Sequence, residues 1–322
     1  MSSAFDHLTG SEKMDIILAL QLGGKRMKPH SVVVLVMVVF SLIAGSAGRS
    51  AAPDLFAKSN LVAWCIVPFD AAQRGPVERA RMLKRLGITR FVYDWRDKDI
   101  PAFDQEIDAL EQYGIKLQGF WLTSGLEPAQ EKNVHAVLDL LKRRKLKTEI
   151  WYLLVPPPTF DRSPQEEKVA QAAKAVQYLA QEAQKIDCSV GLYNHGGWFG
   201  EPENQLAIME RAAMTNVGMV YNFHHGREQM DRFAEFFPKI LPHLMAINLN
   251  GMKKDAPMIL NLGEGDRELE MLRIIRDSGY DGPIGILNHS TERDAEVGLR
   301  ENIEGLKKLL RQLGDAAALE SY

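Results

Sequence analysis

Eight short runs of apolar and β-branched residues recur along the chain, and they predict strands of a parallel sheet that are buried on both faces. The predicted strands span residues 61–68, 90–95, 116–122, 147–155, 189–194, 217–223, 244–249 and 283–288. Each run is short, as strands are, and is followed by a longer segment with a different period. The pattern therefore predicts alternating strands and helices rather than hairpins.

The segments between the runs have helical periodicity, clearest at 77–87, 103–114, 167–185 and 297–314. Gly87 and Gly114 stand where two of these helices should end, as glycine does in left-handed C-caps. In the seventh unit, Asp266 is the expected N-cap and Gly279 the expected stop. Eight alternations over about 260 residues match a (β/α)₈ barrel. We predict one such TIM barrel domain at residues 53–322; an open doubly wound sheet, the competing fold, usually lacks eight regular units.

Residues 1–52 have a different composition and are predicted to be a leader with a signal peptide. Lys25, Arg26 and Lys28 precede an apolar run of 13 residues at 32–44, and small residues follow it. This order is typical of a secretory signal, and the run is shorter than the ~20 residues of a membrane-spanning helix. Met27 is then the expected true start. We expect a periplasmic or secreted protein; an uncleaved membrane anchor is the alternative.

The charge of the chain indicates which classes of partner to expect, and its cysteine content indicates whether disulfides form. Without residues 1–52 the chain has 34 Lys or Arg against 39 Asp or Glu, whereas nucleic-acid enzymes are more often basic. We therefore expect no nucleic-acid partner. The two cysteines, Cys65 and Cys188, fall in the first and fifth units, on opposite sides of a closed barrel. They are expected to be buried free thiols.

Histidines and asparagines cluster just after the predicted strands. His195, His224, His225 and His289 follow strands five, six and eight, whereas His135 and His243 fall in helical segments. Asparagines occur in the same places, at Asn194, Asn222, Asn248, Asn250 and Asn288. Residues beyond the carboxyl ends of barrel strands form the active sites of this fold. We predict that these side chains form the functional site.

These strand-end motifs, LYNHGGWFGE, VYNFHHG, INLNGMKKD with LNLGEGD, and GYDGPIGILNH, resemble those of the xylose isomerase-like barrels, from about residue 61 to 310. That superfamily contains sugar isomerases, epimerases and dehydratases. The resemblance implies acidic and imidazole ligands around a divalent metal that polarises the carbonyl and hydroxyl of a sugar. It also implies that two metal-binding carboxylates, on strands five and eight, exchange the substrate proton.

The chain departs from this pattern at three positions. Asn222, Asn248 and Asn288 stand where the family has Asp, His and Glu, although Asn222 and His225 keep the family's three-residue spacing. Amides are neutral and cannot accept a proton near neutral pH. We therefore expect the family's metal mechanism not to carry over unchanged, and no tight magnesium or calcium site at these asparagines.

The histidines allow three interpretations. His195, His225 and His289 could bind zinc, iron or manganese, completed by Glu201 or an amide. One histidine, His225 or His195, could instead act as a metal-free acid or base. In the third interpretation the histidines are structural. The sequence leaves these alternatives open, and the cofactor unknown.

Other residues near strand ends are candidates for the same site. Trp95, Trp121 and Trp198 are expected to pack against the C–H face of a sugar. Trp64 and Trp151 lie within strands and are expected only to fill the layer between barrel and helices. Among charged residues Glu201 and Lys253 rank as catalytic candidates ahead of Asp94, Lys254 and Glu264. His224 and the five asparagines are predicted substrate contacts.

The function expected from these residues is proton transfer at carbon on a small carbohydrate, as in an exported sugar isomerase, epimerase or lyase. The substrate would be a free sugar or keto-sugar, because export disfavours a phosphorylated cytoplasmic one. A barrel that binds carbohydrate without catalysis is the alternative. Such a protein would bind sugar saturably without exchanging its protons for deuterium.

The leader generates the first testable prediction. We expect the mature protein to begin between Ala44 and Pro53 and to occur outside the cytoplasm, because small residues follow the apolar run there. N-terminal sequencing of the native protein measures this directly. Recovery of an intact terminus at residue 1 would contradict it.

Overall fold

Eight parallel strands close into a barrel in the computed structural model, which describes residues 54–254 and 259–322. The strands pair in chain order, and the last pairs with the first, Leu61 opposite Ile284. Their bounds are β1 Leu61–Trp64, β2 Arg90–Tyr93, β3 Lys116–Ser124, β4 Glu149–Leu154, β5 Ser189–Tyr193, β6 Val217–Asn222, β7 Leu244–Leu249 and β8 Ile284–Leu287. The predicted (β/α)₈ barrel is confirmed. The predicted signal segment lies outside the described residues.

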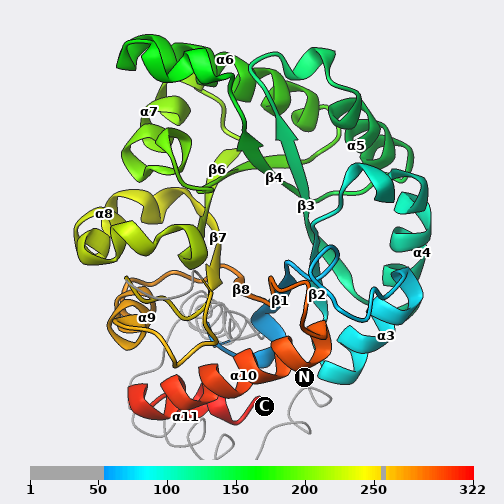
Figure 1. Ribbon diagram of the computed structural model, residues 1–322, viewed down its shortest axis with the longest axis vertical. Helices are drawn as coiled ribbons and strands as arrows, with labels where there is room; N and C mark the ends of the chain where they lie inside the picture. Colours follow the sequence, from blue (N-terminus) through cyan, green and yellow to red (C-terminus); the bar gives the residue numbers. More distant parts are fainter. Residues whose placement is uncertain (1–53, 255–258) are drawn as a thin grey trace, which may run out of the picture. The chain divides into compact units, whose positions relative to one another are not determined.

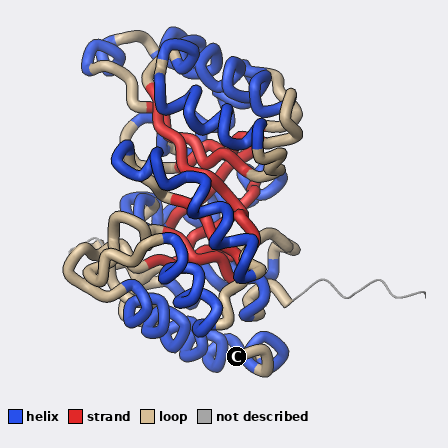
Figure 2. Tube along the Cα trace, turned by 90° about the vertical axis from the view of Figure 1, so that its right-hand side faces the viewer, coloured by secondary structure: helices blue, strands red, loops and turns tan. Residues whose placement is uncertain are grey.

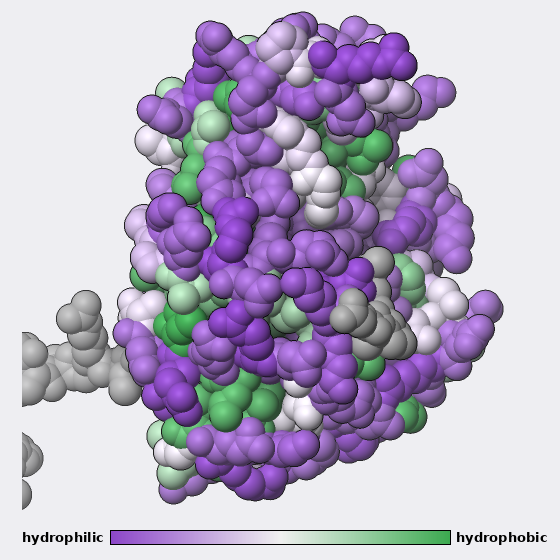
Figure 3. Space-filling model, turned by 60° about the vertical axis from the view of Figure 1, so that its left-hand side comes forward, coloured by the Kyte–Doolittle hydropathy of each residue, from purple (hydrophilic) through white to green (hydrophobic). Residues whose placement is uncertain are grey.

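Helices surround the strands on the outside of the barrel (Figures 1 and 2). With the labels of Figure 1 they are α3 Pro76–Leu86, α4 Phe103–Tyr113, α5 Lys132–Arg143, α6 Gln165–Gln184, α7 Pro202–Ala212, α8 Phe233–Ile240, α9 Glu268–Asp277, α10 Ala295–Leu313 and α11 Ala316–Leu319. Gly87 and Gly114 cap α3 and α4 in the left-handed conformation that the sequence predicts. The helices are amphipathic, and the outer surface in Figure 3 is mostly hydrophilic with small separate apolar areas.

The start of α9 differs from the prediction. Its N-cap is Arg267, with φ of 58°, rather than Asp266. The backbone N–H of Asp266 donates to the carbonyl of Met252, and the Glu268 carboxylate accepts the N–H groups of Gly263 and Gly265. The carboxylate of the first residue of the helix thus holds the preceding loop.

The barrel lumen is filled by side chains, and two tryptophans correct the sequence prediction. Trp64 and Trp151 pack inside the barrel with Tyr193, Val92 and Val220 rather than against the helices. Because β1 is apolar on both faces, its sequence cannot show which side chains point inward. Room for Trp151 comes from Gly119, where an added Cβ would lie 2.9 Å from the indole nitrogen.

Both cysteines are buried and free, as predicted. Within residues 54–254 and 259–322, the helices are too short or too polar to cross a membrane.

The lumen generates a prediction about stability. The Trp151 indole N–H donates to the buried Glu149 carboxylate at 2.8 Å, whereas the Trp198 indole N–H donates to Gln165 nearer the surface at 2.7 Å. We expect Trp151→Phe to lower the free energy of unfolding by about 2–4 kcal/mol, because it leaves a cavity and an unpaired carboxylate oxygen. Trp198→Phe removes the same group and should cost less than about 1 kcal/mol. Urea unfolding of the two variants measures the difference; equal losses would show that the lumen does not depend on this bond.

Candidate functional site

Four histidines meet at the carboxyl-terminal rim of the barrel, as the sequence predicts. The ring centroids of His195 and His225 lie 4.0 Å apart, those of His224 and His225 4.1 Å, and those of His224 and His289 4.6 Å. The rings thus form one continuous cluster from β5 to β8, which we call the imidazole cluster. His195 is exposed, His225 and His289 are half-buried, and His224 is buried.

Local backbone structure brings these rings together. A 3₁₀ turn at Phe223–His225 follows β6, and the Asn222 side-chain oxygen accepts the N–H of His224 at 3.0 Å. On the other side, the N–H of His289 donates to the carbonyl of Cys65 at 3.2 Å. Cys65 and His289 both have positive φ, 52° and 48°. Such strain in residues other than glycine concentrates at functional sites, which supports a role for this rim.

Three rings of the imidazole cluster, those of His195, His225 and His289, favour the neutral form. Burial, and then the neighbouring imidazoles, lower the pKa of His225 to about 2. Burial also lowers the pKa of His195 and of His289, and the Arg96 guanidinium lowers both further. Neutral imidazole has one N–H donor and one acceptor nitrogen. The cluster can therefore donate a hydrogen bond to one oxygen of a ligand and accept a hydrogen bond from a hydroxyl group of the same ligand.

Aromatic rings support the cluster from within the barrel. Tyr193 is 5.8 Å from His225 between ring centroids, edge to face, and Trp121 is 6.2 Å from His195. Tyr193 and Trp121 also pack edge to face at 4.9 Å. Trp121 is half-buried and adjoins the rim, where its ring can contact a ligand. A sugar-binding role for Trp121 stays a prediction.

Two residues that extend the cluster were not expected from the sequence. Phe69 stacks on His289 at 3.9 Å between centroids, and the Arg96 guanidinium lies 5.8 Å from the Phe69 ring. One Arg96 nitrogen donates to the carbonyls of Asp94 and Trp95, which fixes its direction. Both residues follow the first two strands by a few positions, as the histidines follow later strands. Their position a few residues after a strand is the sequence feature that could have identified Phe69 and Arg96 as site residues.

Three of the predicted asparagine contacts are used by the protein itself. Asn194 bridges β5 and β6, accepting the N–H of Asn222 at 2.6 Å and donating to its carbonyl. Asn222 orients His224 and donates to the Tyr193 hydroxyl. Asn288 lies against α10 and donates its amide N–H groups to the Phe69 and Ser290 carbonyls, whereas its buried side-chain oxygen has no hydrogen-bond partner within the described residues. Their amides shape the rim, and a direct role in substrate binding stays a prediction.

Asn248 and Asn250 differ from these three. Both are fully buried on β7 or just after it. Within the described residues neither amide atom of Asn248 has a hydrogen-bond partner, nor has the Asn250 oxygen. Buried polar groups are normally paired. These two amides therefore have hydrogen-bonding capacity left for a ligand or for water.

The remaining candidates lie apart from the cluster. Trp95 is buried between β3 and α4, against Phe103. Trp198 packs on Phe160 in the loop before α7. Glu201 precedes α7 and acts on Tyr221, which faces the helices: burial, and then this carboxylate, raise the tyrosine's pKa. Lys253 is half-buried in the loop after β7. A role of these four residues in ligand binding or catalysis stays a prediction.

The metal implied by the family resemblance does not fit these side chains. Both amide atoms of Asn222 make internal hydrogen bonds, and the amide oxygens of Asn288 and Asn248 are neutral where a hard cation favours carboxylates. Throughout the described part of the chain, no group of three or more His, Cys, Asp or Glu is placed to hold a metal ion. Binding of zinc, iron or manganese by His195, His225 and His289 stays a prediction.

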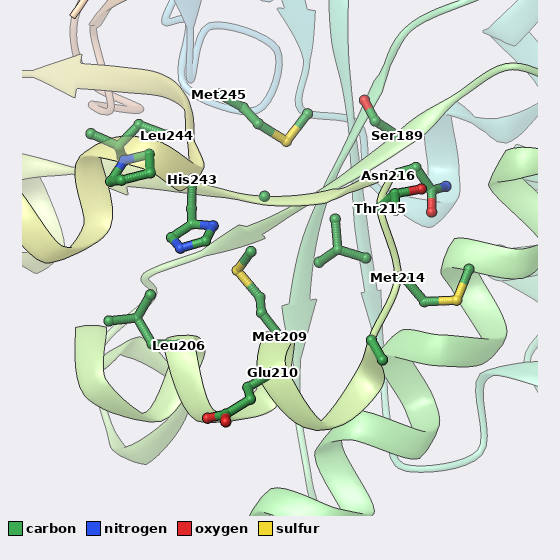
Figure 4. Close-up of a pocket in the computed structure, with 14 residues that line it drawn as sticks. Ser189, Leu206, Met209, Glu210, Met214, Thr215, Asn216, His243, Leu244 and Met245 are labelled. Atoms are coloured by element: carbon green, nitrogen blue, oxygen red, sulfur yellow. The ribbon is translucent and has the colours of Figure 1, made fainter.

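A hollow of about 870 Å³ opens at the opposite rim, beside the first residues of β5, β6 and β7. Figure 4 shows its lining, with His243 and Met209 facing one another and Met214 pointing away. Barrel enzymes act at the carboxyl-terminal face, whereas residues at the amino-terminal face contribute to stability. The hollow is therefore distinct from the candidate site.

Solved structures share this fold at low sequence identity. The 3-keto-D-glucoside 4-epimerase from E. coli is 14% identical, with a TM-score of 0.58 over 79% of this chain and 100% of its own. A D-tagatose 3-epimerase-like protein is 16% identical, with a TM-score of 0.58 over 79% of this chain and 98% of its own. The IOLI protein, solved with a zinc atom, is 10% identical, with a TM-score of 0.58 over 78% and 98%.

Sequence comparison assigns the chain to a family. No curated protein matches it. A family model described as the xylose isomerase-like TIM barrel matches residues 69–309, which run from the loop after β1 into α10. The chain therefore belongs to the xylose isomerase-like TIM barrel family.

Proposed function

We propose that this protein is a sugar isomerase or epimerase that acts on a free sugar or keto-sugar by proton transfer at carbon. The observation that carries the proposal is the imidazole cluster at the catalytic rim of a barrel whose family processes sugars. The half-buried Trp121 ring and the unpaired Asn248 amide add an apolar face and a polar group, which sugar sites combine. We further propose, from the leader sequence, that the protein works in the periplasm or outside the cell.

Neutral imidazoles suit part of this chemistry. Moving a proton between neighbouring carbons of a sugar builds negative charge on the carbonyl oxygen, and an N–H donor aimed at that oxygen stabilises it. His195 and His225 are close enough for one ring to donate to the carbonyl while the other accepts from a hydroxyl. No step here passes through a bound metal.

Carbohydrate binding without catalysis is the second candidate. It is favoured by Asn222, a residue without an ionisable group whose amide is used to hold Tyr193 and His224. His225, with its pKa lowered to about 2, is also a poor base. Incubation of the protein with free aldoses, ketoses and 3-keto sugars in D₂O separates the two functions. Catalysed deuterium incorporation supports the enzyme, and saturable binding without incorporation supports the binding protein.

The neutral cluster also predicts how stability depends on pH. A histidine whose pKa is lower in the folded than in the unfolded state binds fewer protons when folded, so stability is lost as pH falls below the unfolded value of about 6.5. Wild-type protein should therefore lose more free energy of unfolding between pH 7 and pH 5 than His225→Gln does. Urea unfolding at both values measures the difference. His243→Gln, at the opposite rim, is the control and should behave as wild type; parallel curves for all three proteins would contradict burial of a neutral His225.

His225 is also predicted to contact the substrate. His225→Ala should leave the melting temperature within a few degrees and lower sugar binding or turnover at least tenfold, about 1.4 kcal/mol, because it removes a hydrogen-bonding ring at the rim rather than core methylenes. Thermal melts and isothermal titration measure the two effects. His243→Ala should change neither. A variant that unfolds but keeps normal affinity per folded molecule would show that His225 is structural.

A further inference from the structure

A buried carboxylate follows the second strand, at the same end of the barrel as the imidazole cluster, rather than the strands where the resemblance places proton-exchanging groups. Asp94 directly follows β2 and is 1% exposed. Side chains alternate along a strand, and Val92 packs in the lumen whereas Phe91 and Tyr93 pack outward. Asp94 therefore lies on the lumen side, above the packed core.

The two oxygens of this carboxylate are used differently. Oδ1 accepts the backbone N–H of Val67 at 3.2 Å. Oδ2 is buried and has no hydrogen-bond partner within the described residues. A buried carboxylate oxygen that lacks a donor is costly, and such groups in native structures usually have a functional reason. Val67 N–H thus fixes the carboxyl group, while Oδ2 keeps unused capacity to accept a hydrogen bond.

We infer that Asp94 is the carboxylate that carries the substrate proton in this site, taking the place of the family carboxylates that this chain lacks. The inference rests on the proposed function. It makes Asp94 a catalytic residue that acts on the substrate directly or through one water, the range over which proton transfer operates.

The electrostatic surroundings agree with this role. Burial raises the pKa of Asp94 to about 7, and the opposing effects of Arg96, Arg79 and the Val67 N–H are smaller. The other titratable groups that interact with it are the Cys65 thiol and the Tyr193 and Tyr93 hydroxyls, whose pKa values are all raised, chiefly by burial. A base of pKa near 7 is well matched to reaction at neutral pH. By contrast, His225 is too weak a base for the same step.

Two other carboxylates are less suitable. Glu149 is buried in the lumen, but it begins β4 at the opposite end of the barrel and is bound by Gln118 and Trp151. Glu201 lies beside Tyr221 on the helix side. Asp94 combines a position at the rim, a fixed oxygen and an available one.

The proposed step needs no oxidant or reductant. Asp94 Oδ2 takes the proton from the carbon next to the sugar carbonyl, and the C–H electron pair becomes the double bond of an enediolate. The carbonyl π pair moves to oxygen, where an imidazole N–H donates a hydrogen bond. Asp94 then returns its proton to a carbon of the intermediate as the double bond is lost, and a hydroxyl proton moves between the two oxygens.

Asp94→Asn tests this step with little change in shape, because the amide oxygen can still accept the Val67 N–H. We expect deuterium incorporation into D-tagatose, D-fructose and 3-keto-D-glucose to fall at least 100-fold, while affinity for the same sugars stays within about threefold. Wild-type incorporation should rise through pH 7 as Asp94 loses its proton, and the variant should lack this rise. Since a raised carboxyl pKa destabilises the folded state once the group is charged, the variant should be no less stable than wild type at pH 8.

Asp70→Asn is the matched control. Asp70 is also buried at this rim, 5% exposed, but its oxygens accept the N–H groups of Ala72 and Ala295 and pair with Arg74. This variant should lose stability and keep wild-type incorporation per folded molecule.

A second measurement does not depend on the sugar. In ligand-free protein, the infrared difference between wild type and Asp94→Asn should contain the band of one protonated carboxyl that disappears with a midpoint near pH 7; Glu268, whose pKa burial also raises to about 7, is present in both proteins and cancels. A midpoint below pH 5 would overturn the inference, as would an Asp94→Asn variant that incorporates deuterium at the wild-type rate. In the latter case the proposed function would stand. Wild-type protein that binds these sugars and exchanges no deuterium would instead overturn the proposed function, and the role of Asp94 with it.

Discussion

Two hydrogen bonds to the Tyr193 hydroxyl connect the packed interior of the barrel to the residues of its rim. The hydroxyl accepts the Trp64 indole N–H at 3.1 Å and the Asn222 amide N–H, so it joins β1, β5 and β6 across the lumen. The Tyr193 ring also contacts the rings around it, namely Trp64, Trp121, Trp151, His195 and His225. Because Tyr193 is 1% exposed, these contacts are made in a packed interior where small shifts are resisted.

This constraint reaches the imidazole cluster through Asn222. The amide nitrogen of Asn222 is held by Tyr193, so its oxygen is left to accept the His224 N–H and to begin the 3₁₀ turn that carries His225. Asn194 holds the same strand end from β5. A carboxylate at position 222 could not donate to the Tyr193 hydroxyl. The asparagine that departs from the family pattern is therefore suited to orienting the histidines rather than to binding a cation.

The sequence predicted the strands well, because eight short apolar runs in regular alternation with helical segments are compatible with few folds besides the barrel. It could not assign Trp64 and Trp151 to the lumen, since strands that are apolar on both faces carry no signal of direction. Nor could it separate asparagines that complete the rim, such as Asn194, from those with free hydrogen-bonding capacity, such as Asn248. Residue type and position after a strand are the same for both. Only the partner atoms distinguish them.

The burial of individual charged side chains also cannot be predicted from this sequence. Glu201 and Asp94 both follow strands in the sequence, but Glu201 acts electrostatically on Tyr221, whereas Asp94 is buried and accepts the N–H of Val67. The alternation of Val92 and Tyr93 decides the side on which Asp94 lies, and it is visible only when their packing is known. The surroundings then separate two kinds of titratable group at one rim. Burial favours the neutral form of any side chain, so it lowers the pKa of the histidines and raises that of the carboxyl. The burial that makes His225 a poor base therefore makes the Asp94 carboxylate a stronger one, so one rim holds two titratable groups whose pKa values are shifted in opposite directions.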